Sequence, residues 1–195
     1  GLCANTTAAN NVAVGTCALK VSTTGTANVA IGDISLDANT TGSNNTAVGR
    51  SSMSNNTTGG TNAAFGGNAL NANTTGNQNT AAGYQALASN TTAGDNTAVG
   101  YNSLVLNTTG ACNSALGTGS LTANTTGAEN TAVGSAAMLV STTGCKNTFI
   151  GRNSGRDNTE GDENTAIGFN SGCQNTTGDN NAMIGNFAQS SSTTG

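Results

Sequence analysis

Hydrophobic residues recur along this chain at a fixed interval of 17 residues, and no apolar stripe with the spacing of an amphipathic helix survives across a unit. Aligned on glycine, the chain contains ten complete units between Thr16 and Gly185, with a partial unit before them (1–15) and another after them (186–195). We number the positions of a unit from 1, at Thr16, to 17, at Gly32. The whole chain, 1–195, is therefore predicted to be one repeat array.

The apolar positions of the unit are few but regular. Position 4 is Leu or Met in the first nine copies, from Leu2 to Met138, position 15 is mostly Ala, and position 16 is aliphatic or Phe almost throughout. Each coil therefore offers about three candidates for inward-facing side chains. The run NTAVG predicts a short strand closed by Gly, whereas NTTG predicts a turn, because Asn tolerates a left-handed conformation and Gly a positive φ.

Three positions do not vary in any complete copy: position 8, which is always Thr, and positions 13 and 17. Position 17 is Gly in all eleven copies, which predicts a backbone conformation or a close approach that a Cβ atom would forbid. Position 13 is Asn in all eleven copies, and we expect these amides to form an internal ladder from coil to coil. The ladder residues are Asn11, Asn28, Asn45, Asn62, Asn79, Asn96, Asn113, Asn130, Asn147, Asn164 and Asn181.

One unit of this kind cannot bury its own apolar face, but identical units stacked about 4.8 Å apart can pair each strand with the next. The predicted fold is therefore all-β: a stacked parallel β-solenoid or β-roll of 17-residue coils. Three small apolar positions per coil bury little surface, so we expect a homo-oligomer, a trimer or filament, with the Ala and Val columns near its axis.

Composition excludes several classes of function. The chain has no His, and its only lysines, Lys20 and Lys146, are isolated, so we expect no enzyme, no cofactor and no metal site. One acidic cluster (Asp157, Glu160, Asp162 and Glu163) lacks the spacing of an EF-hand loop and is interpreted as a solvated turn. The net charge of −4 includes no basic run for nucleic acid, and no stretch of 18 apolar residues predicts membrane insertion.

Position 7 carries N-T-T sequons, for which two interpretations compete. The asparagines could accept N-linked glycans, or Asn-Thr-Thr-Gly could be turn chemistry with solvated amides, which we favour. The candidate glycan acceptors are Asn5, Asn39, Asn56, Asn73, Asn90, Asn107, Asn124 and Asn175. The odd set of five cysteines (Cys3, Cys17, Cys112, Cys145 and Cys173) has no metal-binding spacing and predicts no closed intrachain disulfide framework.

The segment NNTAVG at Asn44–Gly49 resembles the head repeats of YadA-type trimeric autotransporter adhesins, which end in Ala-Ile-Gly. The pattern NTAVGYNSL followed by NTTG, from Asn96 to Gly110, and AAGYQAL, from Ala81 to Leu87, look still more like repeat arrays of phage tail-fibre-type surface proteins. The resemblance covers essentially the whole chain and implies a left-handed β-roll of three packed chains. The unit here is longer than the autotransporter one, and its Asn stands one residue nearer to the Gly.

Two functions compete at this stage. The first is a rigid structural spacer in an extracellular fibre or phage-like tail fibre, located outside the cell, on its surface or on a virion, and used in adhesion or host attachment. The second is a repetitive binding surface, either a glycan-coated filament or an ice-binding solenoid with threonine ranks at positions 8 and 9. Ice binding favours Thr-x-Thr on a flat strand, and adjacent threonines before Gly do not provide that, so the spacer is preferred.

Overall fold

A computed structural model describes residues 6–189 of the chain, which contain short β-strands and turns and no helix. Each coil contributes one three-residue strand, formed by positions 14 to 16. The strands are β1 (Val12–Val14), β2 (Val29–Ile31), β3 (Thr46–Val48), β4 (Ala63–Phe65), β5 (Thr80–Ala82), β6 (Thr97–Val99), β7 (Ser114–Leu116), β8 (Thr131–Val133), β9 (Thr148–Ile150), β10 (Thr165–Ile167) and β11 (Ala182–Ile184).

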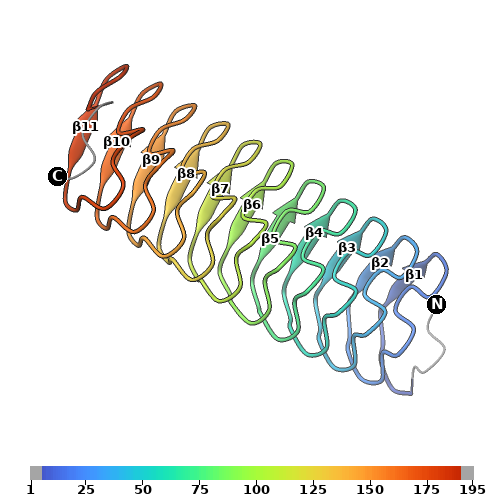
Figure 1. The fold of residues 1–195 in the computed structure, drawn as a ribbon. Coiled ribbons are helices and arrows are strands. Elements are labelled where there is room, and N and C mark those ends of the chain that lie inside the picture. The colour runs from blue at the N-terminus through green and yellow to red at the C-terminus, as the bar shows by residue number, and fades with distance from the viewer. Residues whose placement is uncertain (1–5, 190–195) are drawn as a thin grey trace.

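All eleven strands form one parallel sheet in the order of the sequence. The register is constant at one repeat, so that Ala47, for example, pairs with Ala64. The coils stack side by side into an elongated rod with the two ends of the chain at opposite ends (Figure 1). Ten steps of about 4.8 Å separate β1 from β11 by about 48 Å. The predicted parallel β-solenoid of 17-residue coils is therefore confirmed.

Each coil encloses its own apolar core. The Leu or Met at position 4 and the Ala at position 15 are fully buried in the central coils, as at Leu87 and Ala98. Position 16 was expected to face inward as well, and this was wrong. Val14 is 56% exposed and Leu116 is 49% exposed, because side chains of a strand alternate and the buried Ala at position 15 sends both its neighbours outward.

Left-handed backbone at three positions bends each coil. Residues at positions 2, 4 and 12 have φ near +50° to +60°, including Leu87 (φ 52) and the β-branched Ile34 (φ 48) and Thr61 (φ 59). These residues interrupt the alternation of a strand, so that positions 3 and 4, adjacent in sequence, are both buried, as at Ala86 and Leu87. The bends close the coil at a local cost, because L-residues other than Asn and Asp rarely adopt this conformation.

The bend at position 2 leads to a first prediction. Replacing Ile34 by Asn, the residue that other coils have there, is expected to raise the free energy of unfolding by about 1 kcal/mol, since Asn accepts a left-handed φ more readily than a β-branched side chain. Urea unfolding followed by circular dichroism measures the change. The reverse substitution in another coil, Asn68→Ile, should lower stability by a similar amount, and equal stability of both variants and the parent would contradict the idea.

Core volume is conserved where the repeat departs from its consensus. Position 15 becomes Phe149, and the nearby position 4 becomes Gly155, where an added Cβ atom would clash with the Phe149 ring. In the same way, Gly172 lies against the Met183 side chain, whose Sδ and Cε atoms would each be 2.8 Å from an added Cβ. One large and one small side chain thus exchange places, and the interior stays filled.

Candidate functional site

The position-13 asparagines lie in one column inside the rod, and each amide joins its coil to the next. The Oδ1 atom of Asn79 accepts a hydrogen bond from the backbone N–H of Asn96 at 3.1 Å, and its Nδ2 donates to the carbonyl of Ala93 at 2.9 Å. The same pair of bonds repeats for every rung from Asn11 to Asn164. The column therefore satisfies backbone groups that the short strands leave unpaired.

A second ladder, at position 7, was missed by the sequence analysis. Asn90 Nδ2 donates to Asn73 Oδ1 of the preceding coil at 3.0 Å and to the carbonyl of Ala93 at 3.0 Å. In turn, Asn107 Nδ2 donates to Asn90 Oδ1 at 3.0 Å. Each position-10 carbonyl in the central coils thus accepts two side-chain amides, one from each ladder, as Gly110 does from Asn96 and Asn107.

This second ladder corrects the expectation that the position-7 amides are solvated turn residues or glycan acceptors. Seven of the eight candidates are fully buried: Asn39, Asn56, Asn73, Asn90, Asn107, Asn124 and Asn175. Asn5 lies outside the described residues. A glycan is attached to Nδ2, and in this fold that atom points into the rod and donates to the position-10 carbonyl. The sequon pattern therefore arises from the ladder amide followed by two threonines.

The two threonines after each ladder amide have different environments. At position 8 the side-chain hydroxyl donates to the backbone carbonyl of the same position in the next coil, as Thr91 does to Thr108 at 3.1 Å. At position 9 the side chain is exposed, for example at Thr92 and Thr109. Neither position lies in a strand, so the two flat threonine ranks considered for ice binding do not form here.

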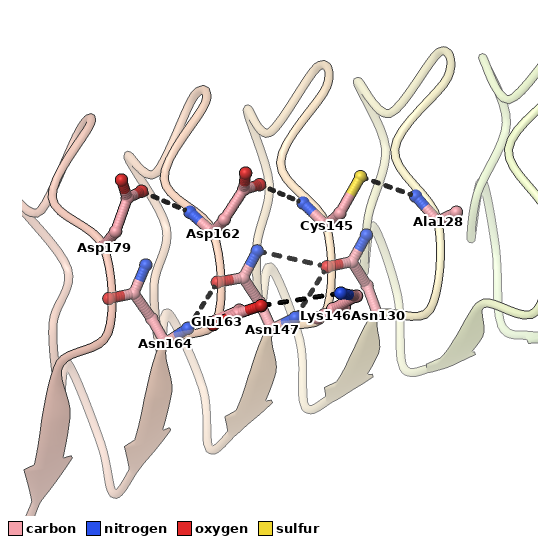
Figure 2. A network of polar contacts seen from close by, with 9 residues as sticks. All are labelled: Ala128, Asn130, Cys145, Lys146, Asn147, Asp162, Glu163, Asn164 and Asp179. Carbon is pink, nitrogen blue, oxygen red and sulfur yellow. Dashed lines mark hydrogen bonds and ion pairs between the residues drawn. The ribbon is translucent and has the colours of Figure 1, made fainter.

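Polar side chains at position 11 form a column on the outside of the turn (Figure 2). The backbone N–H of Ala128 donates to Cys145 Sγ at 3.4 Å, and the N–H of Cys145 donates to Asp162 Oδ1 at 2.7 Å. Asp162 continues the column, because its N–H donates to Asp179 Oδ1 at 2.7 Å. Each of these side chains therefore accepts a hydrogen bond from a backbone N–H of the preceding coil.

Two other acids near this column, Glu163 and Asp157, have partners of their own. Lys146 Nζ lies 3.5 Å from Glu163 Oε1, and Arg156 forms a two-pronged pair with Asp157, which raises the pKa of the guanidinium. In the described part of the chain, no group of three His, Cys, Asp or Glu residues is arranged to hold a metal ion. Cys17, Cys112, Cys145 and Cys173 form no disulfide with one another, and Cys3 lies outside the described residues.

The outer face of the sheet is an uncharged surface that runs along the rod. Positions 14 and 16 of every strand point to this strand face, and neither position carries a charged residue in any copy. All eleven side chains at position 16 form one column, and all but Ala82 are larger than alanine: Val14, Ile31, Val48, Phe65, Ala82, Val99, Leu116, Val133, Ile150, Ile167 and Ile184. Position 14 adds mostly Thr and other small side chains, including Thr80, Thr97 and Thr131.

Aromatic side chains lie at position 1, just beyond Gly at the end of the strand. Tyr84 and Tyr101 of adjacent coils stack with ring centroids 5.9 Å apart, and Arg152 lies 5.8 Å from the centroid of the Phe169 ring. The two tyrosines are about half exposed, at 49% and 54%.

Residues 6–189 contain no pocket and no helix that could cross a membrane. No protein-family model matches the chain, and it has no significant match among curated proteins or solved structures. The fold defines a class, the parallel β-solenoid repeat proteins, and the candidate functional site is the strand face described above.

Proposed function

We propose that this solenoid is a rigid spacer in an extracellular fibre used for adhesion or host attachment, on a cell surface or a virion. The observation that carries the proposal is the uncharged apolar column at position 16, which follows the sheet from β1 to β11. Soluble monomers rarely expose one continuous apolar patch larger than a few hundred Å². Such a face in a rod indicates lateral packing against other chains.

Three copies of the chain around a common axis fit this face best. The face is only two outward side chains wide, about 7 Å along a strand, but about 48 Å long. Narrow strips from three rods can converge on a threefold axis, where the Val and Ile columns become buried and the Thr hydroxyls at position 14 can bond to one another. The buried area grows with the number of coils, so a longer array holds together more firmly.

Self-closure of the coil changes the reason for this proposal. Scarcity of apolar residues first suggested that a coil needs other chains to complete its core. Two amide ladders and the Leu and Ala columns fill the interior of a single coil, so the trimer now rests on the exposed strand face alone.

Mass in solution tests the trimer. Sedimentation equilibrium of the protein should give three times the chain mass of 18.9 kDa. The double variant Val99→Asp/Val133→Asp should sediment as a monomer with an unchanged circular dichroism spectrum, because both side chains point away from the core. A matched control is Ala128→Asp, at position 11, where Asp162 and Asp179 occur in other coils, and it should remain trimeric. A folded parent at 18.9 kDa would overturn the proposed trimer.

Electron microscopy of the full-length product tests the spacer. The expected image is a straight rod in which this array accounts for about 50 Å or more of the length. Removing two whole coils, residues 84–117, should shorten the rod by about 10 Å without loss of folding. A compact particle without a rod would contradict the spacer.

A second candidate function uses the same face. Thr-Ala-Val in β3, β6 and β8 places a hydroxyl and a methyl-rich side chain two residues apart on a flat strand, and this regular spacing suits binding to ordered water or ice. Thermal hysteresis measured for a monomeric protein, and abolished by Val99→Asp/Val133→Asp, would support this candidate over the spacer.

A further inference from the structure

The position-7 ladder is interrupted at Ser141. This serine stands where the preceding and following coils have Asn124 and Asn158, and all three side chains are fully buried. Serine has no carboxamide, and both Asn124 Oδ1 and Ser141 Oγ are left without a hydrogen-bond partner. The side-chain bond that joins intact rungs, such as the 3.0 Å bond from Asn107 to Asn90, is therefore missing on both sides of Ser141.

Hydrogen bonds on the C-terminal side of the break are longer than their counterparts beside an intact rung. Thr142 Oγ1 donates to the carbonyl of Thr159 at 3.3 Å, whereas the matching bond from Thr108 is 2.9 Å long. The N–H of Thr143 donates to the same carbonyl at 3.4 Å, whereas the matching bond from Thr109 is 3.2 Å long. The two turns on this side are thus held less tightly than those of an intact rung.

The same loosening extends to position 10 and to the next rung. An added Cβ atom at Gly144 would lie 2.7 Å from the carbonyl oxygen of Gly161, farther than the matching contact at Gly110, beside an intact rung. Beyond the break the ladder resumes with a bond of 3.4 Å from Asn175 to Asn158, against 2.8 to 3.0 Å along the intact ladder. Several independent contacts of the turn at positions 7–10 therefore weaken at one place.

The strand side of the same coil keeps its usual contacts. The N–H of Asn164 donates to Asn147 Oδ1 at 2.9 Å, so the position-13 ladder continues without a break. The N–H of Thr148 donates to the carbonyl of Asn164 at 2.8 Å, and β9 pairs with β10 in the constant register. The weakening is therefore confined to the turn.

We propose that the turn around Ser141 is a flexible joint, where neighbouring turns part while the strands stay paired. In the closed turn, Asn124 Oδ1 and Ser141 Oγ are buried without partners, and water can satisfy both once the turns separate. An intact rung loses a side-chain bond when it opens, whereas this one has none to lose. Local opening is therefore favoured at this coil over its neighbours, and the rod can bend there without unfolding.

Ser141 is a better place to test the joint than the other serine at position 7. Ser22 also has a buried Oγ without a partner, but the position-7 residue of the coil before it is Asn5, outside the described residues. The turns on both sides of Ser141 are described, so the contacts that are lost can be compared directly with those of intact rungs.

Amide hydrogen exchange of the whole chain, resolved by NMR and corrected for intrinsic rates, tests the joint. The N–H groups of Thr142 and Thr143 should exchange about tenfold faster than those of Thr108 and Thr109, which occupy the same positions beside an intact rung. The N–H of Thr148, in the strand of the same coil, should stay protected. Equal rates at the two turns would overturn the proposal, and so would fast exchange at Thr148, because the whole coil would then open.

Two reciprocal substitutions show whether the missing carboxamide is the cause. Ser141→Asn restores the residue that most other coils have, and it should slow exchange at Thr142 and Thr143 to the rates of Thr108 and Thr109. Asn107→Ser is the matched control: it breaks an intact rung and should raise exchange at Thr108 and Thr109 by about tenfold. Unchanged exchange at Thr142 and Thr143 in Ser141→Asn would refute the joint.

Discussion

Gly100→Ala is expected to destabilise the rod by about 4 kcal/mol or more. Gly100 has φ +138, a conformation open essentially to glycine alone, and an added Cβ atom would lie 2.5 Å from the carbonyl oxygen of Gly117 and 2.6 Å from its carbonyl carbon. Both neighbours are backbone atoms of the next coil. The clash can be relieved only by moving the coils apart, which breaks the adjoining strand pairing.

A glycine at another position provides the control for that substitution. Gly67, at position 1, has no such φ, and an added Cβ would lie at an ordinary 3.4 Å from the Tyr84 ring. Arg50 and Tyr84 occupy the same position in neighbouring coils. Gly67→Ala should therefore change stability by less than about 0.5 kcal/mol in the same urea titration. Similar losses for both variants would show that glycine content, rather than the close approach at position 17, limits stability.

Asn96→Ala and Asn90→Ala should each cost about 2 to 4 kcal/mol, and the two losses should be comparable. Removing the Asn96 amide leaves the N–H of Asn113 without its acceptor and takes one of two donors from the carbonyl of Gly110. Removing the Asn90 amide orphans Asn73 Oδ1 and one proton of Asn107 Nδ2. Each buried group left unsatisfied costs about 1 to 3 kcal/mol.

The comparison between the two ladders decides between a buried and a solvated position-7 amide. If that turn were solvated, Asn90→Ala would cost well under half as much as Asn96→Ala. The exposed Thr92→Ala serves as a baseline, since its side chain is at the surface. Thermal melts of the three variants, with amide hydrogen exchange at Asn113 and Asn107, separate the outcomes. A small loss at Asn90 together with a large loss at Asn96 would contradict the second ladder.

The repeat period and the strand motif were enough to predict the architecture. A 17-residue interval with a single extended run, NTAVG, in each unit has few other solutions than parallel stacking, because every copy must occupy an equivalent place in its coil. The invariant Gly at position 17 also predicted a close approach of the backbone. Gly100 and Gly117, in adjacent coils, show that approach.

The direction of individual side chains could not be obtained in this way. Alternation assigns inward and outward positions only while the backbone stays extended, and left-handed residues such as Leu87 and Ile34 reset the alternation within each coil. Leucine and isoleucine give no local signal for that conformation. The sequence Asn-Thr-Thr-Gly is typical of a solvated turn and gives no local signal of burial. In this fold its Asn is buried, because the Nδ2 atom donates to the carbonyl at position 10, which lies three residues further along the chain.

The exclusive pairing of each coil with its two neighbours determines how the rod would respond to force. No strand contacts any but the adjacent strands within the described residues, and the hydrogen bonds between coils run along the axis. Tension applied along that axis would open one interface at a time, and each opened coil would release about 50 Å of slack, because 17 extended residues span about 58 Å against a 4.8 Å rise. A rod of this kind would therefore lengthen in steps, one coil at a time.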